Sequence, residues 1–146
     1  SCSIDNQAGL IRLRKDGSRS TLPLDAIVVP FRESGDKLIV DAELNGRRTD
    51  MCFDTGAFGV CISKEQCRKI GIKIPETASV STKGPNGRLV DGWEITADVF
   101  LGPIKKRDCP VRVIDSEMSY PLLGQNFFAD RVFSIDRVGK EIRFAR

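Results

Sequence analysis

Histidine is absent from the 146-residue sequence. This absence excludes Ser-His-Asp and Cys-His catalysis within the chain, and it removes the commonest protein ligand of zinc. Chemistry that uses carboxylates without a metal is therefore favoured. We expect neither a metal site nor a cofactor.

Long apolar runs and basic stripes are also missing. No stretch reaches the roughly 20 apolar residues that a transmembrane helix requires. Lysines and arginines are interspersed with acidic residues, so the net charge is only +3 although charged residues make up 29% of the chain. A nucleic-acid-binding surface would need basic residues gathered on one face. The sequence therefore predicts no transmembrane segment and no nucleic-acid partner.

The cysteines match no zinc knuckle and no Cys-x-x-Cys redox motif. They are Cys2, Cys52, Cys61, Cys67 and Cys109. Five is an odd number, so at least one thiol is unpaired within the chain. Cys61 and Cys67 have two interpretations, a disulfide that acts as a redox switch or two idle thiols, and we favour the second.

The start of the sequence bears on localisation. The first residue is Ser1 rather than methionine, which predicts that an upstream segment has been removed. Cys2 is either the lipidated first residue of an exported lipoprotein or an ordinary thiol in a loose tail. We therefore expect export to the periplasm or cell envelope, with a lipid anchor at Cys2 as one alternative and a cytoplasmic location as another.

Size and hydrophobic patterning indicate one β-rich domain. The length suits a single domain, and apolar residues make up 40% of it, including eight phenylalanines that can fill a core. Residues 38–44 alternate with period two, Asn45-Gly46 suits a tight hairpin turn, and residues 47–53 form the return strand. Residues 1–20 look irregular. Further strands are predicted at 22–31, 60–62, 93–101, 109–114, 133–135 and 141–144.

Two short helices are also predicted. Ser63 and Gln66 have the spacing of a capping box, and Gly71 supplies a stop, so residues 64–70 should be helical. A second short helix is expected at 125–129. Many short strands, tight turns and one or two short helices predict an all-β, single-domain closed β-barrel.

The most informative motif is Asp54-Thr55-Gly56-Ala57, which follows the bulky residues Met51-Cys52-Phe53. A carboxylate at the end of a hydrophobic strand, followed by small residues, lets backbone and substrate approach closely. Leu122-Leu123-Gly124, about seventy residues later, is a second apolar pair that ends in glycine. Together the two motifs favour a functional site over a simple turn.

The order of these parts resembles the retropepsin-like aspartic proteases, in particular their single-domain bacterial members. The shared order is a hairpin with Asn-Gly, a strand into Asp-Thr-Gly-Ala, a short helix, a Gly-rich hairpin, and Leu-Leu-Gly before a small helix. The resemblance implies a protease domain at residues 24–146 and an N-terminal extension at 1–23. The C-terminal Phe144-Ala145-Arg146 does not obviously match the strand with which the viral enzymes dimerise.

The resemblance also implies roles for single residues. Asp54 is the expected catalytic aspartate, and the Thr55 hydroxyl is expected to tie two active-site loops together across a dimer. Gly56 is expected to contact the substrate backbone, and Ala57 to line the pocket beside it. The Leu122-Leu123-Gly124 element is expected to pack under the catalytic loop. The expected flap, residues 82–92, has a tip formed by Gly84, Pro85, Asn86, Gly87 and Arg88.

Catalysis in this class needs two carboxylates that share one proton. The charged one acts as general base on a water held between them, and the neutral one acts as acid toward the scissile carbonyl. The sequence holds no second Asp-Thr-Gly or Asp-Ser-Gly, because Asp16-Gly17 and Asp91-Gly92 lack the hydroxyl residue. We therefore predict an aspartic endopeptidase that cleaves polypeptides as a two-fold homodimer, with Asp54 of each copy facing its mate.

Two other interpretations stay open. The chain could be an inactive retropepsin-like module that binds an extended peptide or a partner protein, although the intact Asp-Thr-Gly argues against this. It could also be an unrelated β-barrel in which Asp54 begins an ordinary turn, because Asp, Thr and Gly are common turn residues.

Overall fold

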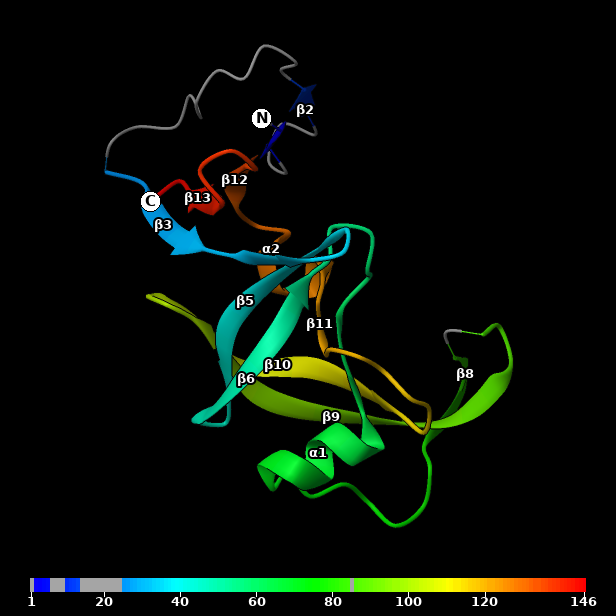
Figure 1. Ribbon diagram of the computed structural model, residues 1–146. Coiled ribbons are helices and arrows are strands. Elements are labelled where there is room, and N and C mark those ends of the chain that lie inside the picture. Colours follow the sequence, from blue (N-terminus) through cyan, green and yellow to red (C-terminus); the bar gives the residue numbers. More distant parts are fainter. Residues whose placement is uncertain (1, 6–9, 14–24, 85) are drawn as a thin grey trace.

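The computed structural model of the chain describes residues 2–5, 10–13, 25–84 and 86–146. It consists of strands and two short helices, as the sequence predicts (Figure 1). The strands are β1 (Cys2–Asp5), β2 (Leu10–Leu13), β3 (Ile27–Pro30), β4 (Arg32–Ser34), β5 (Lys37–Leu44), β6 (Arg47–Phe53), β7 (Val60–Ser63), β8 (Val80–Lys83), β9 (Leu89–Leu101), β10 (Ile104–Ile114), β11 (Leu122–Leu123), β12 (Val132–Asp136) and β13 (Glu141–Phe144). The helices are α1 (Lys64–Ile70) and α2 (Gln125–Phe128).

An eight-stranded sheet forms most of the fold and closes on itself. Its order is β4-β5-β6-β11-β7-β10-β9-β8, and an additional pairing joins β5 to β9. In this pairing Glu43 lies opposite Phe100 and Leu44 opposite Val99. The predicted closed β structure is therefore present, and buried apolar side chains fill its interior.

The hairpin of β5 and β6 delivers the chain to Asp54. Asn45 and Gly46 at its turn have φ angles of 49° and 78°, the positive values that the tight hairpin turn requires. The alternation predicted for residues 38–44 is confirmed, with Ile39 buried in addition. The last three residues of β6 are buried, so this strand is anchored in the core immediately before Asp54.

Helix α1 begins and ends where the sequence predicts. The Ser63 hydroxyl accepts the Gln66 N–H at 3.0 Å, and Gln66 Oε1 accepts the Ser63 N–H at 2.9 Å, which completes the capping box. Gly71 ends the helix with a φ of 76°, and its N–H donates to the Arg68 carbonyl. Among the described residues, no helix has the length and apolar content needed to cross a membrane.

The N-terminal region differs from the expectation of irregular structure over residues 1–20. β1 pairs antiparallel with β12, with Cys2 opposite Ile135, and β2 pairs with β1. The backbone of Cys2 therefore belongs to a strand rather than to a loose tail. β1 depends on a partner about 130 residues away, which no local pattern in the sequence could reveal, and β2 is placed through its pairing with β1. Residues 14–24 lie outside the described residues, and the domain boundary after residue 23 stays a prediction.

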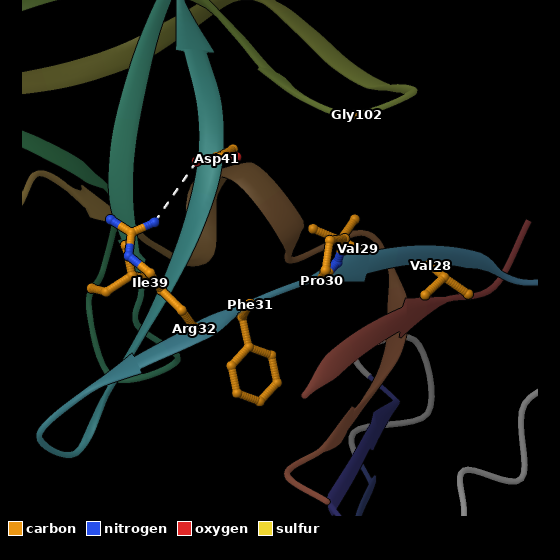
Figure 2. Close-up of a pocket in the computed structure, with 8 residues that line it drawn as sticks. All are labelled: Val28, Val29, Pro30, Phe31, Arg32, Ile39, Asp41 and Gly102. Atoms are coloured by element: carbon orange, nitrogen blue, oxygen red, sulfur yellow. Dashed lines mark ion pairs between the residues drawn. The ribbon is translucent and has the colours of Figure 1, made fainter. Parts of the chain in front are cut away.

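A second sheet has five strands in the order β2-β1-β12-β13-β3. Its edge strand β3 is shorter than the predicted strand 22–31, of which residues 22–24 lie outside the described part of the chain. The chain then passes through Phe31 into β4 of the large sheet. A hollow of about 370 Å³ lies at this crossing (Figure 2), with the Val28 side chain 45% exposed beside it.

Phenylalanines join the two sheets. The Phe53 ring stacks on Phe128 with centroids 4.6 Å apart, and Phe128 meets Phe133 edge-on at 5.2 Å. Phe144 completes the cluster, and all four rings are buried. Phe53 directly precedes Asp54, so the start of the candidate loop is fixed by α2 and the terminal hairpin β12–β13.

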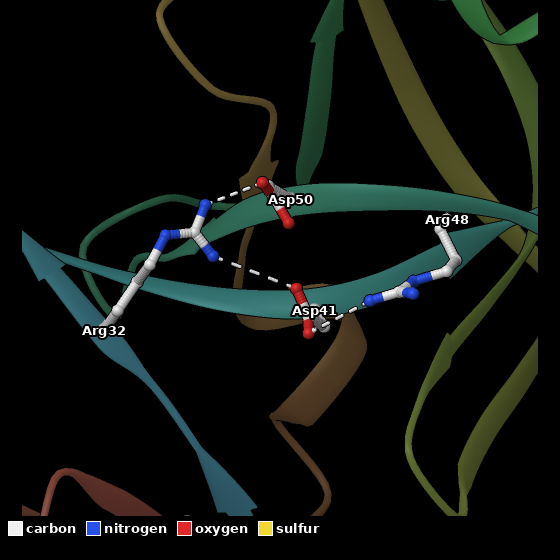
Figure 3. A network of polar contacts seen from close by, with 4 residues as sticks. All are labelled: Arg32, Asp41, Arg48 and Asp50. Atoms are coloured by element: carbon white, nitrogen blue, oxygen red, sulfur yellow. Dashed lines mark hydrogen bonds and ion pairs between the residues drawn. The ribbon is translucent and has the colours of Figure 1, made fainter.

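A polar network covers the outer face of β4, β5 and β6 (Figure 3). The Arg32 guanidinium donates to Asp50 Oδ2 at 2.6 Å, and its other amino group lies 3.8 Å from Asp41 Oδ1. Arg48 donates to the same Asp41 carboxylate at 3.4 Å. The hydrogen bond from Arg32 lowers the pKa of the Asp50 carboxyl, because the bond favours its charged form.

We expect Asp50→Asn to lower the thermal stability slightly at pH 7, and by progressively less as the pH falls below about 4. A carboxyl whose pKa is depressed in the folded state contributes stability above its unfolded pKa of about 3.9, and this contribution is lost as the pH falls through the folded value. The effect is small because the Arg32 and Asp50 side chains are 51% and 49% exposed. Thermal melts across this pH range measure it. The double variant with Arg32→Gln should be non-additive, whereas additive losses would contradict the pairing.

Candidate active site

Asp54 lies where two distant segments of the chain meet. β6 pairs in parallel with β11, with Cys52 opposite Leu122 and Phe53 opposite Leu123. The Asp54 N–H donates to the Leu123 carbonyl at 3.1 Å. The structure thus brings together the two motifs that the sequence analysis singled out.

The residues after Asp54 form a tight turn. Asp54 Oδ1 accepts the Gly56 N–H at 2.9 Å, and the Asp54 carbonyl accepts the Ala57 N–H at 3.2 Å. Asp54 and Thr55 are half-buried and Gly56 is exposed. The carboxylate is therefore held by its own loop while the loop surface remains open to a ligand.

Gly124 allows the two segments to touch. A Cβ atom on Gly124 would lie 2.3 Å from the Gly59 carbonyl oxygen and 2.8 Å from the Ala57 carbonyl oxygen. Backbone oxygens cannot yield easily, so no residue larger than glycine fits. The glycine of Leu122-Leu123-Gly124 is thus explained by close packing against the loop after Asp54.

Helix α2 braces the same loop through groups that the sequence analysis did not single out. The Gln125 and Asn126 N–H groups donate to the carbonyls of Ala57 and Phe58 at 2.9 and 3.2 Å. The Gln125 side chain donates to the Thr55 carbonyl at 2.7 Å.

The Asn126 side chain extends this bracing to two further strands. Its Oδ1 accepts the Val60 N–H, and its Nδ2 donates to the Pro110 carbonyl, both at 2.9 Å. The only sequence signal for these residues was the position of Gln-Asn directly after Leu-Leu-Gly.

The predicted flap is a hairpin of β8 and β9. Val80 pairs with Gly92 and Lys83 with Leu89. At its tip the Gly84 N–H donates to the Arg88 carbonyl at 2.8 Å, and the Asn86 side chain accepts the Arg88 N–H at 3.1 Å.

Gly87 takes a φ of 78° at this tip, which explains the glycine there. Pro85 lies outside the described residues. Figure 1 shows the hairpin projecting away from the body of the closed sheet, as a flap over a peptide would require.

The loop of residues 115–121 connects β10 to β11 and lies beside the predicted flap. A Cβ on Gly84 would lie 3.3 Å from Ser116 Oγ, so the flap tip rests beside this loop. Gln66 of α1 donates from Nε2 to the Met118 carbonyl at 2.9 Å. The Pro121 carbonyl accepts the Cys52 N–H at 2.8 Å. Gln66 therefore joins the helix cap to a loop that contacts both the flap and the strand before Asp54.

We expect Gln66→Glu to loosen this loop while it leaves α1 intact. A glutamate can still accept the Ser63 N–H in the capping box, but it cannot donate to the Met118 carbonyl. The free energy of unfolding should fall by about 1–2 kcal/mol, because a partly buried carbonyl loses its donor. Chemical denaturation and amide hydrogen exchange at residues 116–120 measure the change. Ser63→Ala is the matched control, since it should weaken the helix cap without increasing exchange in the loop; equal exchange in both variants would contradict the role of Gln66.

A pocket of about 820 Å³ opens beside the loop after Asp54. Ala57, Val60 and Leu122 contribute to its largely apolar lining, together with residues of β9 and β10. An ion pair between Arg112 and Glu94 forms a charged part of the wall. Ala57 thus lines this pocket. Asp54 is not part of the lining, so the pocket flanks the carboxylate.

Four cysteines between residues 52 and 109 carry no disulfide. Cys52, Cys61, Cys67 and Cys109 are all free thiols. Burial raises the pKa of Cys67 to about 11 and also raises that of Cys61, where the charge of Arg112 opposes the shift. The reactive thiolate is therefore scarce near neutral pH. Of the two interpretations of Cys61 and Cys67, idle thiols fit the structure.

Comparisons with known proteins agree with this geometry. Residues 40–130 match the family described as gag-polyprotein putative aspartyl protease. Sequence comparison with curated proteins gives no significant match.

Many solved structures are similar to this chain, and three of them illustrate the shared fold. A retropepsin-like aspartic protease from Rickettsia conorii is 20% identical with a TM-score of 0.60, over 82% of this chain and 89% of that one. The protease of EIAV in complex with the inhibitor HBY-793 is 13% identical with a TM-score of 0.52, over 65% and 88%. The retroviral protease-like domain of Ddi1 from Leishmania major is 15% identical with a TM-score of 0.50, over 75% and 94%.

Proposed function

The chain belongs to the gag-polyprotein aspartyl protease family and has the retropepsin-like fold, and we propose that it is an aspartic endopeptidase. Asp54 is its catalytic residue. One observation carries the assignment. Asp54 stands at the end of a core strand, in a loop that is held to Leu123 and α2 by backbone hydrogen bonds and packs against Gly124. Such bracing preorganises a carboxylate for chemistry.

The second carboxylate of the reaction comes from a second copy of the chain. No other Asp-Thr-Gly exists in the sequence, and two-fold symmetry would place the two Asp54 residues opposite each other. Two carboxylates that face each other in this way share one proton, so one is charged and the other neutral. Their apparent pKa values belong to the pair.

The reaction then follows from these two protonation states. The charged Asp54 removes a proton from a water molecule, whose oxygen attacks the scissile carbonyl carbon. The neutral Asp54 gives its proton to the carbonyl oxygen, and a tetrahedral diol forms. The neutral carboxyl then gives its proton to the amide nitrogen while the charged carboxylate takes the proton of one diol hydroxyl. The C–N bond breaks, which leaves a carboxylic acid and an amine, and the pair again holds one proton.

The neighbouring residues hold the dimer and the peptide. The Thr55 hydroxyl would link the two loops across the symmetry axis, and the exposed Gly56 would contact the substrate backbone. The flap would hold the peptide extended by main-chain hydrogen bonds and exclude bulk water. The substrate is accordingly a polypeptide in extended conformation.

The test is cleavage of a denatured protein between pH 4 and 7 by the wild-type chain and by Asp54→Asn. Cleavage that depends on Asp54 supports the proposal. Equal rates for the two proteins reject it. A wild-type chain that binds extended peptides without cleaving them would identify an inactive peptide-binding module instead.

A further inference from the structure

Phe58 is the most exposed large apolar side chain of the described residues. Its relative exposure is 92%, whereas the phenylalanines of the core are fully buried. A whole aromatic ring in water forgoes the stabilisation that burial would bring. Phe58 also lines the largely apolar pocket beside the loop after Asp54, so its ring extends an apolar surface of the kind that another molecule covers.

The backbone that carries Phe58 is held firmly. The Phe58 carbonyl accepts the Asn126 N–H at 3.2 Å, and the preceding Ala57 carbonyl accepts the Gln125 N–H at 2.9 Å. The following Gly59 packs directly against Gly124. The ring is therefore presented outward by a braced turn, so little conformational freedom is lost when a partner covers it.

Phe58 also lies close to Asp54. Phe58 is the fourth residue after Asp54, so the two Cα atoms lie at most about 14 Å apart. If two Asp54 carboxylates face each other across a two-fold axis, the turns that contain Phe58 lie beside that axis in both copies. An isologous contact places the same surface of each copy in the interface.

The C-terminal strands β12 and β13 lie inside the five-stranded sheet, whose two edges are β2 and β3. In the described residues, β13 is bonded to β12 on one side and to β3 on the other. β12 is likewise enclosed between β13 and β1. The C-terminal strand is therefore unavailable to a second copy. The outer strand β3 contains Pro30, which cannot donate a ladder hydrogen bond.

We infer that Phe58 anchors the contact between two copies of this chain, an inference that rests on the proposed function. In this contact the Phe58 ring of one copy is covered by the turn around Phe58 of the second copy. The hollow beside Val28 is a weaker candidate for this contact, because none of its lining residues comes from the loop after Asp54.

Sedimentation equilibrium of the wild-type chain and of Phe58→Ser tests this inference. The dimer dissociation constant should rise at least about 30-fold in Phe58→Ser, the loss typical of truncating a central aromatic anchor. The monomer should retain its circular dichroism and melting temperature, since the ring makes few contacts within its own chain. Phe58→Leu should restore most of the association.

Val138→Ser is the matched control. Val138 is 84% exposed in the turn between β12 and β13, so its loss should leave the dissociation constant unchanged. An unchanged constant in Phe58→Ser overturns the inference. If Phe58→Ser raises the KM for peptide cleavage and leaves the dissociation constant unchanged, the ring contacts substrate instead. If Val28→Ser dissociates the dimer, the hollow at β3 is the interface.

The outcomes for the two proposals are separable. A Phe58-dependent dimer without peptidase activity would reject the proposed function and leave this inference standing. Asp54-dependent cleavage by a dimer whose dissociation constant is unchanged in Phe58→Ser would support the proposed function and reject this inference. A wild-type chain that stays monomeric at every accessible concentration overturns the inference.

Discussion

Asp54→Asn should lower the rate of peptide-bond cleavage by about 10³-fold or more. The asparagine can neither accept the proton of the attacking water nor donate one to the scissile carbonyl, and a positioned acid or base contributes about 10²–10⁴-fold. In a homodimer a single substitution removes both carboxylates. Initial rates on a denatured protein, measured between pH 4 and 7, give the effect.

The folded structure should survive this substitution. Asparagine Oδ1 can still accept the Gly56 N–H, which Asp54 Oδ1 accepts at 2.9 Å. An unchanged melting temperature would assign the lost activity to chemistry rather than to misfolding. Full activity in Asp54→Asn would reject the assignment.

Mixing the two proteins tests whether the carboxylates act jointly. After equal amounts exchange subunits at random, roughly a quarter of the dimers contain two wild-type copies. Activity per total protein should fall to about that fraction if both carboxylates are required. A fall to about one half would mean that each chain works alone.

Gly124→Ala should lower the free energy of unfolding by about 3 kcal/mol, at the upper end of the usual cost of overpacking. The added methyl group would lie 2.3 Å from the Gly59 carbonyl oxygen, so the loop and β11 must separate. The hydrogen bonds from α2 to Ala57 and Phe58 would then lengthen. Urea denaturation measures the stability, and the cleavage rate should fall as well because the Asp54 loop is displaced.

Gly56→Ala is the control for this clash. Its added Cβ would lie 3.4 Å from Asp54 Oδ1, an ordinary contact, and Gly56 does not have a positive φ. The free energy of unfolding should change by no more than about 0.5 kcal/mol. KM should still rise if Gly56 contacts the substrate backbone. A loss of stability as large as that of Gly124→Ala would contradict the explanation for Gly124.

Several parts of the candidate site could be predicted because they depend on neighbours in the chain. The capping box of Ser63 and Gln66, the stop at Gly71 and the turn at Asn45-Gly46 involve residues within a few positions of one another. The alternation of β5 reports which side chains face the core. These signals need no knowledge of distant segments.

The bracing of the site could not be predicted in the same way. Gln66 reaches Met118 and Gln125 reaches Thr55, over separations of 52 and 70 residues. Each contact uses a common polar residue, so nothing in the residue type marks it. The pairing of β1 with β12 was missed for the same reason.

By itself, then, the sequence determined the elements, their order and the family resemblance, because local propensity and motif spacing are written along the chain. Only the tertiary structure decided that Gly124 must be glycine, that the Cys61 and Cys67 thiols are free, and that Phe58 is exposed beside Asp54. All three depend on which remote segments pack together. That packing follows from the burial of apolar surface over the whole chain rather than from any single stretch of it.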